Sequence, residues 1–101
     1  MILYNITYNI DKEIETDWTG WMKIVHIPKI MASGFFSSVR MYKLLNIEDA
    51  GSTYSIQFMS DSLEKVQEFL EQSAQLLAQE HNHRYKDKHI AFRTVLQEVE
   101  L

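Results

Sequence analysis

Residues 2–10 alternate so regularly that they constrain the fold of the whole chain. Five apolar or aromatic side chains fall on one side of an extended segment: Ile2, Tyr4, Ile6, Tyr8 and Ile10. A period of two over nine residues, with β-branched and aromatic members, is typical of a half-buried β-strand. We therefore expect other elements of the chain to cover the apolar side of this strand.

Two amphipathic helices and three more strands account for most of the remaining chain. A helix capped by Asp11 and ended or kinked by Pro28 carries the apolar stripe Ile14, Trp18, Trp21 and Val25. A second helix, capped by Asp61, is expected to bury Leu63, Val66, Phe69, Leu70, Leu76 and Leu77. Strands are expected over residues 35–45, 53–59 and 89–99, with a turn over 46–52.

This order predicts an α+β fold of ferredoxin-like β-α-β-β-α-β order, forming a single domain over residues 1–101. Its four-stranded antiparallel sheet would have two helices on one face, and nothing in the chain would cover the other. We expect that open face to carry Leu3, Asn5, Thr7, Ser38, Arg40, Tyr42, Ser55, Gln57, Met59, Ala91, Arg93 and Val95. Such a partly apolar face favours a homodimer with sheets packed face to face, a dimeric α/β barrel; the alternative is a solvated sheet face.

The net charge and the composition argue against several classes of binding partner. The formal net charge of −4 argues against nucleic acid, whose non-specific binding depends on clustered Lys and Arg. No apolar run approaches the roughly 20 residues of a membrane span, and no signal peptide is evident. The absence of cysteine suits a reducing compartment. We expect a soluble, cytoplasmic protein with no membrane partner, and no motif in it predicts a cofactor.

Three motifs carry a resemblance to a known family. They are Trp18-Thr19-Gly20-Trp21, then His26-Ile27-Pro28, then Gly34-Phe35-Phe36. Together they resemble a small bacterial domain-of-unknown-function family with a ferredoxin-like fold. That family is similar to the dimeric α/β-barrel group, which includes stress-responsive barrel proteins and cofactor-free monooxygenases of antibiotic biosynthesis. The resemblance implies a dimer with a cavity between the sheet and the first helix, and it implies no reaction.

Two arginines are the main candidates for binding a ligand. If Arg40 and Arg93 both point to the open face, they suit a carboxylate or phosphate group. They could equally pair with acids of a second subunit or reach solvent. Asn5 and Gln57 could orient such a ligand, although both are ordinary on a wet sheet face. Tyr42 and Trp18 could supply aromatic walls, although tryptophans at helical spacing are more often core.

His26 is the weak candidate for a catalytic group. It is expected in the last turn of the first helix, where it could act as a general acid or base or simply bond to a free carbonyl. An enzyme of the cofactor-free monooxygenase or cyclase type predicts that His26, Tyr42 and Arg40 converge on one pocket. The sequence favours the structural alternative.

His81, His83 and His89 follow a spacing that could bring imidazoles to a metal. Positions two apart on a helix point in different directions, so a solvated polar loop is the better interpretation and no metal site is predicted.

The sequence thus predicts a homodimeric barrel that binds a small organic molecule, an anionic one if the arginines converge, between sheet and first helix. The alternative is a protein-interaction or assembly module without a ligand pocket.

Overall fold

Strands and helical segments alternate along the chain in the computed structural model, which describes residues 1–45 and 50–101. The strands are β1 (Ile2–Asp11), β2 (Ser38–Lys43), β3 (Gly51–Ser60) and β4 (His89–Gln97). The helical segments are η1 (Lys12–Ile14), α1 (Glu15–Trp21), η2 (Met22–His26), α2 (Ile27–Ala32), α3 (Leu63–Gln72) and α4 (Ala74–Arg84). Residues 46–49, most of the predicted turn over 46–52, lie outside the described residues.

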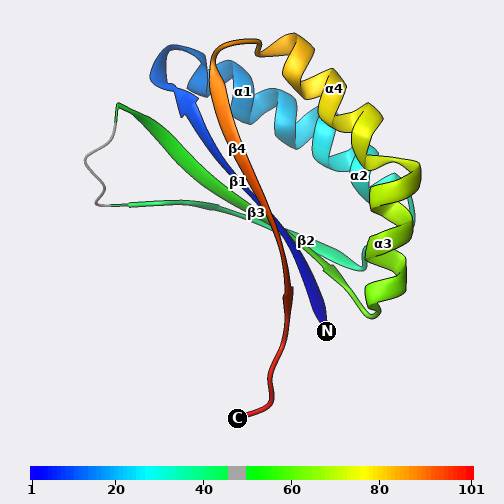
Figure 1. The fold of residues 1–101 in the computed structure, drawn as a ribbon. Coiled ribbons are helices and arrows are strands. Elements are labelled where there is room, and N and C mark those ends of the chain that lie inside the picture. The colour runs from blue at the N-terminus through cyan, green and yellow to red at the C-terminus, as the bar shows by residue number, and fades with distance from the viewer. Residues whose placement is uncertain (46–49) are drawn as a thin grey trace.

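The four strands form one antiparallel sheet in the order β2-β3-β1-β4. Figure 1 shows the helical segments gathered on one face of this sheet, with the other face bare. This arrangement confirms the α+β, ferredoxin-like fold with helices on a single face. None of the described helices is long and apolar enough to cross a lipid bilayer.

The alternation of β1 defines the core. The five apolar or aromatic residues at its even-numbered positions, from Ile2 to Ile10, are buried beneath the helices. Tyr54, Ile56 and Phe58 of β3 join them on the same face, as the sequence predicts. β2 is shorter than predicted, because Phe36 leaves the sheet and stacks on Tyr4, with 6.0 Å between ring centroids.

In β4, the set of alternate side chains that faces the helices is the opposite of the set predicted; we call this the phase of the strand. Ile6 of β1 pairs with Arg93, so these two side chains share the face that the helices cover. The prediction that Ala91, Arg93 and Val95 lie on the open face is therefore wrong, because neighbouring residues of a strand point to opposite faces. The open face carries Ile90, Phe92, Thr94 and Leu96 instead.

The first helix runs past Pro28 by opening one wide turn. In η2, a π-helical segment, the amide of Ile27 donates to the carbonyl of Met22, five residues back. Proline has no amide hydrogen to donate, and Pro28 lies in the first turn of α2, where helical amides need no partner within the helix. The wide turn also keeps Trp18, Met22, His26 and Ile30 buried at steps of four, in place of the predicted stripe through Val25.

Two predicted helix caps are wrong. The carboxylate of Asp11 caps no helix. The second helix is capped by Ser62, whose hydroxyl accepts from the amide of Lys65 at 3.2 Å, while Asp61 forms an ion pair with the Lys65 side chain. Serine offers a shorter, uncharged acceptor close to the free amides of the first turn.

The second helix is interrupted at Ser73, which separates α3 from α4. Of the apolar residues predicted for its buried face, Val66 and Phe69 are buried, whereas Leu63, Leu70 and Leu76 are exposed. The break at Ser73 interrupts the helical periodicity before Leu76, whereas Leu63 and Leu70 lie within α3 to one side of Val66 and Phe69.

Glu15 fastens the start of α1 to β2 and β3. Its carboxylate accepts hydrogen bonds from Tyr54 at 2.5 Å and Ser52 at 2.8 Å and pairs with Lys43 at 2.9 Å. These donors, Tyr54 first, lower the pKa of Glu15 to about 2. Burial and the same carboxylate raise the pKa of Tyr54 to about 12.

Candidate functional site

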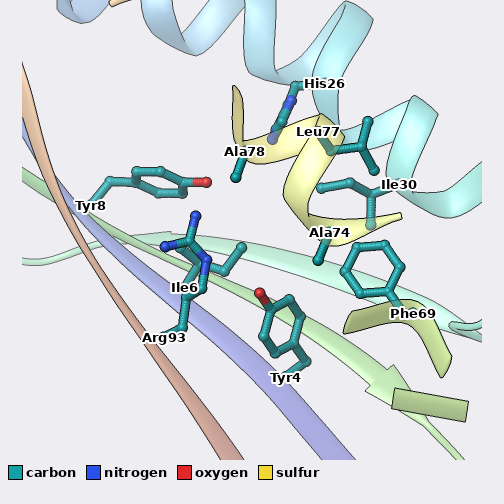
Figure 2. A pocket seen from close by; sticks show the side chains of 10 residues that line it. All are labelled: Tyr4, Ile6, Tyr8, His26, Ile30, Phe69, Ala74, Leu77, Ala78 and Arg93. Atoms are coloured by element: carbon teal, nitrogen blue, oxygen red, sulfur yellow. The ribbon is translucent and has the colours of Figure 1, made fainter. Parts of the chain in front are cut away.

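A small cavity lies between the sheet and the helices. Its volume, measured for the centre of a water molecule, is about 10 Å³, which is room for one water. Figure 2 shows the side chains that line it: Tyr4, Ile6, Tyr8, His26, Ile30, Phe69, Ala74, Leu77, Ala78 and Arg93. Larger hollows of about 330 Å³ lie on the outer surface. One of them lies beside Gly20 and Ile24, and none of the side chains that line it is fully buried.

Two tyrosines and one arginine form the polar wall of the cavity on the sheet side. Tyr4 and Tyr8 lie four residues apart on β1 and flank Ile6, whose partner on β4 is Arg93. This register places the guanidinium between the two tyrosine rings, and Figure 2 shows both hydroxyls pointing inward. The positive charge of Arg93 acts on both tyrosine hydroxyls.

Both tyrosine hydroxyls stay protonated at neutral pH. Burial raises the pKa of Tyr4 and of Tyr8, and it outweighs the opposing effect of the positive charge on Arg93. No described residue accepts a hydrogen bond from either hydroxyl. The wall therefore offers two hydroxyl protons and a cation to the cavity.

His26 forms part of the opposite wall. The π-turn holds its side chain inward at only 2% exposure, stacked on Trp21 with 5.0 Å between ring centroids. Its Nδ1 atom is buried and has no hydrogen-bond partner among the described residues. Burial lowers the pKa of His26 to about 4, with Glu80 opposing that shift and Lys29 adding to it. The ring is thus neutral at pH 7, with one donor and one acceptor nitrogen.

Close to His26, a hydrogen bond joins α1 to α4. Trp18 donates from Nε1 to Nε2 of His81 at 2.8 Å, and both side chains are buried. Nε2 of His81 therefore carries no proton. Burial, with His89 and His26 nearby, lowers the pKa of His81 to about 3. The ring centroids of His81 and His26 lie 5.6 Å apart.

These positions correct two predictions about histidine. His26 does not end a helix or bond to a free carbonyl, because the helix continues through α2. His81 does not lie in a solvated loop but in the core, whereas His83 is exposed. His89 bonds to the Tyr85 carbonyl and to Asn82. Within residues 1–45 and 50–101, no group of three His, Asp or Glu side chains could hold a metal ion.

The predicted site residues divide between the two faces of the sheet. Arg93 and His26 line the cavity, whereas Arg40 and Tyr42 lie on the open face. The prediction that His26, Tyr42 and Arg40 converge on one pocket is therefore wrong. Trp18 does not line the cavity either, because its ring is fully buried beside it.

Polar side chains in the middle of the open face bond to one another. Asn5 accepts from Ser55 at 2.6 Å and donates to Thr7 at 3.1 Å, and Gln57 donates to Ser55 at 3.3 Å. Asn5, Gln57, Arg40 and Tyr42 occupy this face as predicted, and their binding of a ligand stays a prediction.

The β4 side of the open face is strongly apolar. Ile90, Phe92 and Leu96 are 60%, 65% and 50% exposed. The corrected phase of β4 thus makes this face more apolar than the sequence predicts.

Sequence reasoning missed the part that Tyr4 and Tyr8 have in the cavity and treated them only as core. A signal was present, because a buried tyrosine needs a partner for its hydroxyl and two of them share one face of β1. The burial of His81 had a signal too. Leu77, His81 and Tyr85 recur at steps of four along one helical face.

A family profile matches almost the whole chain. The match to DUF4286, a domain of unknown function, spans residues 1–99. The chain belongs to the DUF4286 family. This confirms the predicted membership of a domain-of-unknown-function family with a ferredoxin-like fold. No curated protein is significantly similar in sequence.

Several solved structures share the fold of this DUF4286 domain. An ethyl tert-butyl ether D (EthD) family protein from Bacillus halodurans aligns with a TM-score of 0.71 and 10% identity, over 98% of this chain and all of the other. A dimeric ferredoxin-like protein from an uncultured marine organism has a TM-score of 0.66 and 14% identity, over 100% and 97%. SnoaB, a cofactor-independent oxygenase from Streptomyces nogalater, has a TM-score of 0.61 and 10% identity, over 99% and 95%. At these identities the likeness concerns the fold alone.

Proposed function

We propose that this DUF4286 domain binds a small organic molecule between the sheet and the first helix. The observation that carries the proposal is a set of polar groups without partners that face one cavity. The hydroxyls of Tyr4 and Tyr8 point into it and have no acceptor among the described residues, and the neutral ring of His26 lines the opposite side. An unsatisfied buried polar group costs about 1–3 kcal/mol, and a bound molecule that accepts these hydrogen bonds would recover part of this cost.

We further propose that the protein acts as a cytoplasmic homodimer whose two open sheet faces pack together. The exposed apolar side chains of β4, with Phe92 at their centre, support this arrangement, because monomers rarely expose a contiguous apolar patch. A dimeric ferredoxin-like protein shares the fold. The net negative charge supports neither nucleic acid nor an anionic membrane surface as a partner.

A second candidate is a protein-interaction or assembly module without a ligand. The small volume of the cavity and the internal hydrogen bonds around Asn5 favour it, because they leave little space and few free polar groups for a ligand. An oxygenase or cyclase function has lost its geometric support, because Tyr42 and Arg40 lie away from His26.

Native mass spectrometry of the gently purified protein separates these candidates. We expect a dimer that carries a small adduct, that loses the adduct in His26→Phe and that keeps it in His83→Phe. His83 is the matched control because it is an exposed histidine. Phe92→Glu is expected to give a monomer. An adduct-free dimer would favour the interaction module, and a wild-type monomer would refute the face-to-face dimer.

A further inference from the structure

We propose that the cavity recognises a small monocarboxylate, held by Arg93 together with the hydroxyls of Tyr4 and Tyr8. The inference rests on the proposed binding function and names the chemical class of the ligand. It is carried by the charge, the hydrogen-bond donors and the size of the cavity wall.

Among the described residues that line the cavity, Arg93 has the only charged side chain. No described carboxylate lies within ion-pair distance of it. Glu80, the acid whose charge acts on His26, pairs with Lys29 at 3.0 Å. A guanidinium that faces a partly buried space without a counter-ion favours an anionic ligand, because carboxylates match its planar donor geometry.

The neutral groups around Arg93 can each donate a hydrogen bond to a ligand. The hydroxyls of Tyr4 and Tyr8 have no acceptor among the described residues, so their protons are left for a ligand. His26, neutral at pH 7, has one N–H to donate and one nitrogen that accepts. A carboxylate has about four lone-pair positions and no proton at neutral pH, so it complements this excess of donors.

The single positive charge of the wall disfavours a phosphate dianion. A phosphate dianion would face one cation here and keep an uncompensated charge in a partly buried space. The rest of the wall is apolar, with small side chains at Ala74 and Ala78 on α4. Arg93 is exposed at the edge strand, so its side chain can move outward to admit a carboxylate with a short apolar body.

The test is a titration followed by amide chemical shifts in ¹⁵N-labelled protein at constant ionic strength. Acetate and propionate are each compared with the corresponding amide, and inorganic phosphate is added separately. We expect at least one acid to shift the signals of residues around Tyr4 and His26, and to bind at least tenfold more tightly than its amide. Arg93→Gln is expected to weaken that binding at least tenfold, and Arg40→Gln, the same change on the opposite face, to leave it unaltered.

The other outcomes distinguish the carboxylate proposal from the broader proposal that the cavity binds a small molecule. Equal binding of acid and amide at these signals, unaffected by Arg93→Gln, would leave the small-molecule function standing and refute the carboxylate. Tighter binding of phosphate than of any carboxylate would also refute it. If no acid and no amide shifts the cavity signals, neither the carboxylate nor the small-molecule function stands. The amide spectrum of each variant reports at once whether it is folded.

Discussion

The two buried histidines predict a loss of stability between pH 7.5 and pH 5. The pKa of His81 is about 3 and that of His26 about 4 in the folded protein, against 6.5 for a free histidine. As pH falls below 6.5, the unfolded chain therefore binds protons that the native protein does not, and the free energy of unfolding decreases. Integrating this difference gives about 2 kcal/mol per histidine at pH 5. The lowered pKa of Glu15 has its effect only below pH 4.5.

His81→Phe isolates one of these contributions. At pH 7.5 the variant leaves the Trp18 indole N–H buried without an acceptor, which costs about 1–3 kcal/mol. Between pH 7.5 and pH 5, however, it should lose about 2 kcal/mol less than the wild type, because one titrating ring is gone. The pH dependence, rather than the stability itself, is therefore the informative quantity.

Urea unfolding followed by far-ultraviolet circular dichroism measures both effects without relying on tryptophan fluorescence near the mutated site. Protein concentration is held fixed so that association does not alter the midpoint. His83→Phe, an exposed matched control, should keep the wild-type pH dependence. If His81→Phe also keeps it, His81 is not held neutral by burial and the description of this core is wrong.

Two further predictions concern contacts between secondary-structure elements. Glu15→Gln should lower the free energy of unfolding by about 1.5–3 kcal/mol at pH 7, because the hydrogen bond from Tyr54 loses its charged acceptor. An unchanged urea midpoint would show that the Glu15 carboxylate does not stabilise the protein. Gly51→Ala should destabilise the protein by about 1–3 kcal/mol, since the new Cβ would lie 2.4 Å from the carbonyl oxygen of Ile10. Gly20→Ala is its opposite control: nothing lies within 4 Å of the new Cβ, and alanine should stabilise this helix by up to about 1 kcal/mol in a thermal melt.

The parts of the fold that follow from local patterns were predictable. β1 has apolar or aromatic residues at five alternate positions and only Leu3 in the other phase, so the sequence indicates which of its sides is buried. β4 has apolar residues in both phases, with Phe92 in one and Val95 in the other. Its phase is set by pairing with β1, more than 80 residues earlier in the chain, and local periodicity carries no information about that register.

The candidate site was predictable only in part for the same reason. Arg93 was identified as a ligand candidate but placed on the wrong face with β4, whereas the position of Arg40 followed correctly from β2. His81 was hidden by its polar neighbours, because a histidine next to other polar residues looks solvated until the partner of its ring, Trp18, is known. Contacts between residues distant in sequence decide such cases.

The wide turn at η2 has a consequence for how related chains can differ in length. It holds one residue more than a regular α-helix needs to bring His26 onto the same side as Trp18. A relative with one residue fewer between these positions, and no proline two places after the histidine, would keep both side chains facing the sheet with a regular helix. Alignments within the family should therefore tolerate a single-residue gap here, whereas a gap elsewhere in the helix would rotate His26 away from the cavity.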